Sequence, residues 1–146
     1  MADVLIRDVR VGDGEGLATC WIDIGRYVAT LSPVHFQVPD ADGLVAWFDE
    51  LTARRIRKAD ADRCEFVAEV DGRVVGFVGA RVLQPMDSSS RQVMRELSQI
   101  RAEVTVLAVS EAHRRQGIGT RLMETVEQWA RGRGADLATV DPVFPI

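Results

Sequence analysis

Apolar residues recur at two different spacings along the chain, and these spacings predict which segments are helices and which are strands. Helical stripes, with an apolar residue at every third or fourth position, run from Leu17 to Leu31 and from Leu44 to Leu51, and a third starts at Ile118. Alternating or short continuous apolar runs predict strands over 4–11, 64–70, 73–83, 100–109 and 137–140. The predicted order is therefore β-α-α-β-β-β-α-β.

Turn-forming and capping residues mark several boundaries between these elements. Asp13 is expected to cap the first helix, and Ser32-Pro33 to end it. Pro39-Asp40 is expected to open the second helix. Asp71-Gly72 predicts a tight hairpin between two strands. A short helix is expected over 91–97.

This order of elements predicts a single domain over residues 1–146 with an α/β (α+β) fold. Strands joined by a hairpin pair antiparallel, whereas a strand, a helix and a further strand form a parallel crossover. The sequence therefore predicts a mixed, mainly antiparallel sheet with helices on both faces. A chain of 146 residues is long enough to bury a core of its own.

The charge balance limits the classes of partner. Eighteen Lys and Arg against 22 Asp and Glu leave a net charge of −4, which argues against nucleic acid or an anionic membrane as a general partner. Residues 1–60 hold ten Asp and Glu against seven Lys and Arg, which mildly favours a cationic ligand over an acidic one. The sequence contains no apolar segment typical of a signal peptide or a membrane span, so the expected location is cytoplasmic.

Cysteine and histidine usage does not indicate a metal site. Cys20 and Cys64 fall at apolar positions of the periodic pattern and are expected to be buried free thiols. Their spacing fits no metal-binding motif. His35 lies alone in a predicted loop and is expected to be solvated. We therefore assign no metal ligand.

A glycine-rich basic loop separates the predicted strand from the third helix. Its sequence is Arg114-Arg115-Gln116-Gly117-Ile118-Gly119-Thr120. It ends at a helix N-terminus, where backbone N–H groups lack partners and the helix dipole adds positive charge. Gly117 and Gly119 have no Cβ, so an anion can approach the backbone closely, and Arg114, Arg115 and Arg121 add full charges. The loop therefore predicts a cradle for a phosphate-bearing ligand.

Two better-known phosphate loops are excluded, and one simpler interpretation stays open. A Walker loop requires a lysine after its last glycine, and Gly119 is followed by Thr120. A dinucleotide-binding fingerprint requires a third glycine where Leu122 stands. A glycine pair before a helix can also be a plain cap that binds no ligand.

The same part of the sequence resembles the GNAT superfamily of acetyl-CoA-dependent N-acyltransferases. The resemblance rests on 102–110, Ala-Glu-Val-Thr-Val-Leu-Ala-Val-Ser, and on 113–123, His-Arg-Arg-Gln-Gly-Ile-Gly-Thr-Arg-Leu-Met. That family carries an Arg/Gln-x-x-Gly-x-Gly/Ala loop shortly after a strand of the Leu-Ala-Val type. Arg114, Gly117 and Gly119 correspond to this pattern position by position. The family's order of elements also agrees with the predicted order.

The resemblance implies an N-acetyltransferase with acetyl-CoA as co-substrate and a primary amine as acceptor. The amine would attack the acetyl group directly within a ternary complex. The acceptor, whether a small amine or an amine of a protein or peptide, is not indicated by the sequence. The pyrophosphate of coenzyme A would lie on the loop, at Arg114, Arg115, Gln116, Gly117, Ile118, Gly119 and Thr120.

The resemblance also places the pantetheine arm along the backbone of Leu107, Ala108 and Val109, where the family splays two strands apart. The Leu107 amide would face the thioester oxygen and act as an oxyanion donor. Leu107 and Val109 can at the same time be core residues, because binding through the backbone leaves their side chains free to pack.

Glu103 is the residue expected to take the proton from the amine. It lies four residues before Leu107, and the period of two in a strand would put both side chains on one face. The family often places a glutamate here, which acts directly or through water. The alternative is a charged residue at the end of the sheet without a catalytic role. Glu65 and Glu69 are weaker candidates and are expected on the solvent face.

The end of the sequence departs from the family. In the family a tyrosine on a helix after the fifth strand often protonates the leaving thiolate, and neither that helix nor the last two strands has a counterpart here. We therefore expect a domain that is incomplete at its C-terminus, or an apolar edge at 137–140 that a second copy covers in a homodimer. A non-catalytic acyl-CoA-binding, sensing or partner-docking module is the alternative function, followed by a generic phosphate binder.

Overall fold

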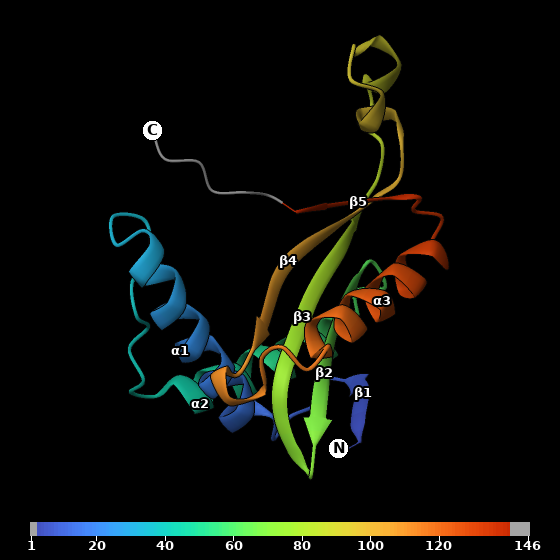
Figure 1. The fold of residues 1–146 in the computed structure, drawn as a ribbon. Helices are drawn as coiled ribbons and strands as arrows, with labels where there is room; N and C mark the ends of the chain where they lie inside the picture. The colour runs from blue at the N-terminus through green and yellow to red at the C-terminus, as the bar shows by residue number, and fades with distance from the viewer. Residues whose placement is uncertain (1–2, 141–146) are drawn as a thin grey trace.

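The computed structural model describes residues 3–140 and contains one five-stranded sheet (Figure 1). The strands lie in the order β1-β2-β3-β4-β5, and each is antiparallel to the next except for β4 and β5, which are parallel. The predicted mixed, mainly antiparallel sheet is confirmed. The strands are β1 Val4–Asp8, β2 Arg63–Val70, β3 Arg73–Leu83, β4 Arg101–Val109 and β5 Leu137–Val140.

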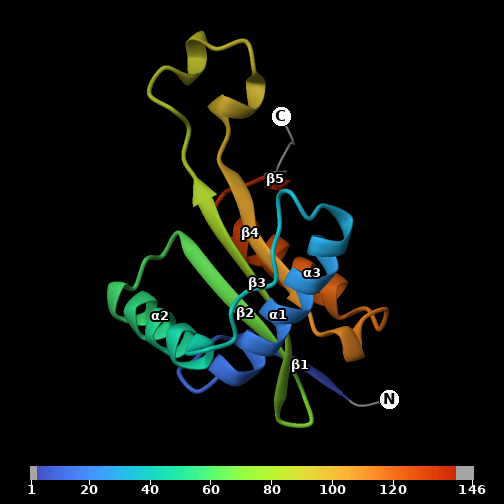
Figure 2. The same cartoon turned by 90° about the vertical axis from the view of Figure 1, so that its left-hand side faces the viewer.

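Helices cover both faces of this sheet, as the element order predicts. α1 Gly14–Leu31 and α2 Leu44–Lys58 lie on one face, and α3 Ile118–Arg131 lies on the other (Figure 2). In the part of the chain that the structure describes, none of the helices is long and apolar enough to cross a membrane. Three short 3-10 helices lie in the connections: η1 Ser89–Arg91, η2 Arg95–Ser98 and η3 Glu111–His113.

Each face of the sheet carries a core of its own, because neighbouring residues of a strand point to opposite faces. The core under α1 and α2 consists of Leu17, Ala18, Cys20, Phe48, Val67, Phe77 and Ala108. The core under α3 includes Ala68, Val78, Val104, Ile118, Leu122 and Val126. Trp21 packs edge to face on Phe48 in the first core, with 6.3 Å between the ring centroids.

Gly76 allows α3 to approach β3 closely. A Cβ on Gly76 would stand 3.2 Å from Ile118 Cγ2 and 3.3 Å from both the Ala108 carbonyl oxygen and Leu122 Cδ1. Contacts this short in a close-packed core would push the helix or the strand aside. The glycine therefore seats the first turn of α3 directly on the sheet.

Asp13 precedes α1 as predicted, but its side chain does not cap the helix. Its carboxylate accepts hydrogen bonds from the Arg7 guanidinium at 2.8 and 2.9 Å and from the Arg10 backbone N–H at 2.9 Å. Burial alone would raise the pKa of Asp13, but these hydrogen bonds outweigh burial and lower the pKa. Asp49 of α2 supplies the acceptor that Asp13 does not provide at the start of α1. Its Oδ1 accepts hydrogen bonds from the backbone N–H groups of Gly12 and Gly14, each at 3.0 Å.

Two of the other predicted boundaries are confirmed and one is wrong. α1 ends before Pro33, and Asp71-Gly72 forms the hairpin with both residues at positive φ. α2, however, begins at Leu44 rather than at Pro39. An Asx turn, in which Asp40 Oδ1 accepts the Asp42 N–H at 3.0 Å, precedes a left-handed Gly43 that delays the helix.

The connection between β3 and β4 forms an arm that projects beyond the rest of the molecule (Figure 1). The arm contains η1 and η2, so two separate 3-10 turns replace the single short helix predicted over 91–97. The Met94 backbone between them is extended, which interrupts a continuous helix. The long strands β3 and β4 therefore carry the arm at their far end, away from the body of the sheet.

Candidate active site

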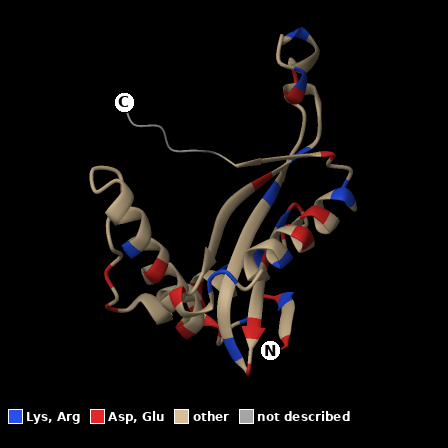
Figure 3. Ribbon diagram, viewed as in Figure 1, with Lys and Arg blue, Asp and Glu red and all other residues tan. Residues whose placement is uncertain are grey.

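The loop between β4 and α3 encloses a hollow of about 250 Å³ at the N-terminus of the helix. Figure 3 shows basic residues along this connection. The structure brings together here most of the residues predicted to hold the cofactor, whereas Gln116, Leu107 and Ala108 are not part of the lining. The lining consists of Val109, His113, Arg114, Arg115, Gly117, Ile118, Gly119 and Thr120.

The backbone of this loop suits an anion. Gly117 is the N-cap of α3 with φ at 79°, and Arg115 has φ at 62°, both in the left-handed region. Among the described residues no side chain caps the helix, so the N–H groups of its first turn are available to a ligand. A Cβ on Gly119 would meet only Val109 Cγ2, at an ordinary 3.9 Å. The space in front of Gly119 is therefore open, as a bound phosphate requires.

Arg114 lines the hollow, but the rest of the protein already engages part of its guanidinium. Its Nε donates to the Val109 carbonyl oxygen at 3.2 Å, and its Cζ lies 5.3 Å from the centroid of the Tyr27 ring. Its Nη2 is buried and has no hydrogen-bond partner in the part of the chain described. Arg121 is also engaged elsewhere, since its Nη1 donates to the Val4 carbonyl oxygen at 2.8 Å.

Arg115 is the residue that supplies free positive charge to the hollow. It is exposed, it lines the hollow, and among residues 3–140 no carboxylate pairs with it. The guanidinium group can bind phosphate oxygens with two parallel hydrogen bonds. The two adjacent arginines of the motif thus occupy different environments.

His113 also lines the hollow and was not identified from the sequence. Its Nδ1 lies 2.9 Å from the Ser110 hydroxyl oxygen, in a partly buried pair that fixes the ring. In the sequence, the feature that indicates this contact is the Ser-x-x-His spacing directly after the predicted strand. The imidazole and hydroxyl groups of this pair add polar partners at the rim of the hollow.

The backbone of β4 next to the hollow has one free edge. In an antiparallel ladder, successive residues turn their N–H and C=O groups alternately toward one neighbour and away from it. Val109 pairs with Gly76, and the Ser110 N–H donates to the Val75 carbonyl oxygen at 2.8 Å. This register directs the Ala108 groups toward β3 and those of Leu107 and Val109 toward β5. Pairing with β5 is confined to Arg101–Val104 within residues 3–140.

A β-bulge at Thr105 reverses the alternation by which the side chains of β4 point to one face of the sheet or the other. Gly79 pairs with Val106 while Ala80 pairs with Val104, so Thr105 is the extra residue. The Thr105 and Val106 side chains both stand 3.1 Å from the point that a Cβ on Gly79 would occupy. A side chain before the bulge and one an even number of residues later, after the bulge, therefore point to opposite faces of the sheet.

This bulge overturns the prediction that Glu103 and Leu107 share a face. Val104 packs in the core under α3, whereas Val106 and Ala108 pack in the core under α1 and α2. Glu103 therefore faces the α1 side and Leu107 the α3 side. The Leu107 amide is unaffected, because a backbone N–H lies in the plane of the sheet.

Glu103 is held by an ion pair with Arg81, its neighbour across the ladder. Arg81 Nε and Nη2 lie 3.0 and 2.9 Å from Glu103 Oε1. The Glu103 side chain is 17% exposed, so it is reachable from solvent but not a freely solvated rim residue. A carboxylate fixed in this way has a defined position next to the free part of β4.

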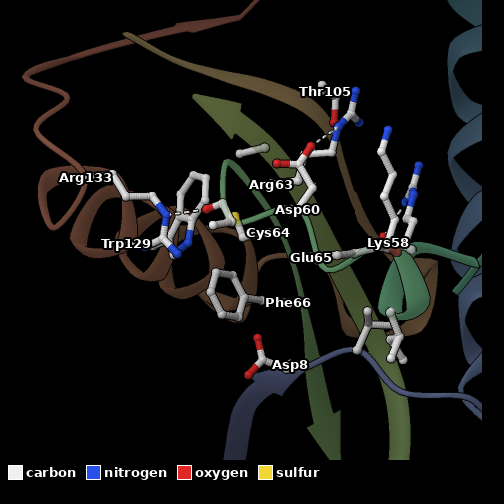
Figure 4. A pocket seen from close by; sticks show the side chains of 16 residues that line it. Asp8, Lys58, Asp60, Arg63, Cys64, Glu65, Phe66, Thr105, Trp129 and Arg133 are labelled. Carbon is white, nitrogen blue, oxygen red and sulfur yellow. Dashed lines mark hydrogen bonds and ion pairs between the residues drawn. The ribbon is translucent and has the colours of Figure 1, made fainter. Parts of the chain in front are cut away.

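A second cavity, of about 680 Å³, lies elsewhere, around the start of β2 between the C-terminal ends of α2 and α3 (Figure 4). Glu65 lines it with a side chain only 9% exposed and pairs with Arg55, so the expectation of a solvent-facing Glu65 is wrong. Glu69 is likewise paired, with Arg7 at 3.3 Å. Burial raises the pKa of Glu65, and the Arg55 contact offsets only part of this.

The two cysteines are free thiols as predicted, and Cys20 is buried, but Cys64 is only partly buried. Neither thiol is activated. Burial raises the pKa of Cys20 and of Cys64 to about 12. Within residues 3–140, no group of three or more His, Cys, Asp or Glu side chains could hold a metal ion.

Comparison with known proteins agrees with this geometry. The model of the acetyltransferase (GNAT) family matches residues 29–143, more than half of the chain. The Xenopus tropicalis protein named "Probable N-acetyltransferase camello" is 33% identical over 75% of this chain, and human N-acetyltransferase 8 is 38% identical over 53% of it. The chain spans 50% and 30% of the length of these two curated relatives.

The fold is also found among solved structures. A transcriptional regulator from Bacillus halodurans C-125 superposes with a TM-score of 0.68 at 21% identity. The match covers 97% of this chain and 83% of that chain. Strand order, the glycine loop at the start of α3 and the family match agree with one another. The chain therefore belongs to the GNAT acetyltransferase family.

Proposed function

We propose that this protein transfers the acetyl group of acetyl-CoA to a primary amine by direct attack within a ternary complex. Family membership supports acetyl transfer in general. The observation that carries the finer proposal is the juxtaposition of two features: the open hollow at Gly117 and Gly119, and the free backbone edge at Leu107 and Val109.

The residues of the loop fit the phosphate end of acetyl-CoA. The uncapped first turn of α3, the open space at Gly119 and the free Arg115 side chain provide donors and room for a pyrophosphate. The outward backbone groups of Leu107 and Val109 provide hydrogen bonds for an extended amide-containing arm. When bound, acetyl-CoA supplies the activated acetyl thioester.

The remaining chemistry requires a proton acceptor and an oxyanion donor. An ammonium acceptor must first lose a proton, which Glu103 takes directly or through water. The amine nitrogen then bonds to the acetyl carbonyl carbon, whose oxygen takes up negative charge beside the Leu107 N–H. The carbon–sulfur bond breaks, the nitrogen loses its second proton to water as the amide forms, and the departing coenzyme A thiolate takes a proton from water and leaves as the thiol.

A second candidate function is a non-catalytic module that binds acyl-CoA. The Arg81–Glu103 ion pair favours it, because a carboxylate held by a guanidinium is also a common structural element. Turnover separates the two functions: a catalyst releases free coenzyme A thiol from acetyl-CoA in the presence of a panel of primary amines. Binding of acetyl-CoA without amine-dependent thiol release would support the module instead.

We further propose that a second copy of the chain covers the edge of the sheet at β5. Val140 is 67% exposed, and within residues 3–140 β5 pairs with β4 alone. An apolar strand edge is a template for pairing with another chain. Sedimentation equilibrium is expected to give twice the 16.1 kDa mass of one chain. A stable monomer would contradict the dimer.

A further inference from the structure

Arg114 lies between α1 and the end of β4 and touches both. Its Nε donates to the Val109 carbonyl oxygen at 3.2 Å, and its guanidinium lies over the Tyr27 ring with Cζ 5.3 Å from the centroid. We propose that Arg114 is a positioning residue that fixes the free edge of β4 for the pantetheine arm, rather than a ligand of the pyrophosphate. This inference rests on the proposed binding of acetyl-CoA.

The contact with Tyr27 is part of a seam that joins α1 to the β4–α3 connection. Asp23, one helical turn before Tyr27, accepts the Glu111 backbone N–H at 2.8 Å. Two successive turns of α1 thus contact the connection, and the Tyr27 turn does so through Arg114, which also holds the Val109 carbonyl oxygen at the end of β4.

The hydrogen bond from Arg114 to the Val109 carbonyl oxygen determines which ligand groups the free edge of β4 can bind. The Val109 C=O points away from β3 and is already engaged by Arg114 Nε. The Val109 N–H on the same edge remains a donor without a partner among the described residues. A free donor beside an engaged acceptor selects a carbonyl oxygen. An amide carbonyl of the pantetheine arm has this chemistry.

The neighbouring Arg115 shows what a phosphate ligand in this loop requires. Its guanidinium is exposed at the hollow, and within residues 3–140 it makes no ion pair. A bidentate contact with phosphate needs two free N–H groups on one side of the guanidinium. Arg114 has committed its Nε to a carbonyl and covers Tyr27 with its plane. Arg115 is therefore the arginine suited to the phosphate end of the ligand, and Arg114 the one that positions the end of β4.

The test compares acetyl-CoA with ADP, which carries the pyrophosphate but no pantetheine. Calorimetry on the full chain is expected to show that Arg114→Ala weakens acetyl-CoA binding about tenfold and leaves ADP binding within about twofold. Arg115→Ala, the matched control, is expected to weaken both ligands to a similar degree. Tyr27→Leu is expected to weaken acetyl-CoA binding about threefold and to add little to Arg114→Ala.

Arg114→Lys keeps the charge but cannot reproduce the fork of N–H groups, and it provides a second variant should Arg114→Ala unfold. It is expected to lose acetyl-CoA affinity as the alanine variant does. Equal losses of acetyl-CoA and ADP in Arg114→Ala, or full acetyl-CoA affinity in Arg114→Lys, would overturn the positioning role alone. A parent protein that binds no acetyl-CoA would overturn the proposed function together with this inference.

Discussion

Arg81 holds Glu103 through a single carboxylate oxygen. Two of the three guanidinium nitrogens, Nε at 3.0 Å and Nη2 at 2.9 Å, contact Oε1, and within residues 3–140 Oε2 has no hydrogen-bond partner. One oxygen is therefore used for positioning, while the other is available to accept a proton. This asymmetry is what a base held in place beside a reacting amine requires.

Glu103→Gln keeps the shape of the side chain and removes its basicity. We expect turnover to fall by roughly 10²–10⁴ while acetyl-CoA affinity stays the same, because a positioned base acts on the chemical step. Steady-state kinetics and calorimetry measure the two quantities separately. Glu127→Gln, an exposed carboxylate on α3, is the control. Unchanged turnover in Glu103→Gln would leave Glu103 with a purely structural role.

Gly76→Ala tests the close seating of α3 on β3. The added methyl group would stand 3.2 Å from Ile118 Cγ2 and 3.3 Å from the Ala108 carbonyl oxygen. We expect the free energy of unfolding in urea to fall by about 1–3 kcal/mol, the usual cost of overpacking a core. Gly132→Ala at the other end of α3 meets nothing closer than 3.4 Å and is the matched control. Equal stability of the two variants would refute this packing account.

Much of this architecture follows from local patterns in the sequence. The stripe from Leu17, the Asp71-Gly72 turn and the glycine loop each use residues close together in the chain. Their geometry therefore depends on propensities that the sequence displays directly. The family resemblance in 102–123 points to the same loop that lines the hollow at α3.

The features that the sequence did not predict depend on contacts between distant segments. The bulge at Thr105 lies in an apolar run where an extra residue leaves no mark on the pattern, so Glu103 and Leu107 were assigned to one face. Arg114 meets Tyr27, and Glu65 meets Arg55, only once the sheet has brought their elements together. Side-chain contacts of this kind are decided by tertiary packing rather than by periodicity.

The ionised Asp13 side chain should stabilise the fold at neutral pH and lose this effect in acid. Its pKa in the folded protein is lowered below the ordinary value of 3.8, so its contribution to stability is fully present well above pH 3.8. The contribution is lost as pH falls through the lowered pKa. Asp13→Asn should therefore be most destabilising near neutral pH and lose its effect in acid. Urea unfolding as a function of pH measures this, and a pH-independent difference from the parent would contradict it.

The ionisation of Glu65 should change stability with pH in the direction opposite to that of Asp13. Its pKa in the folded protein is raised above the ordinary value of 4.5, so its protonated form favours folding and stability falls as pH rises through the raised pKa. Glu65→Gln should lack this fall and gain stability relative to the parent across the same interval. The same urea series tests it. A relative loss with rising pH would show that the Arg55 contact outweighs burial.

The central claim is that the loop at the start of α3 binds acetyl-CoA, and calorimetric titration of the parent and of Gly119→Val tests it most directly. A valine at Gly119 would occupy the open space in front of the helix, whereas Gly132→Val places the same side chain at the far end of α3. We predict that the parent and Gly132→Val bind acetyl-CoA and that Gly119→Val, still folded by its thermal unfolding curve, does not. Absence of binding by the parent, or equal binding by Gly119→Val, would contradict the account.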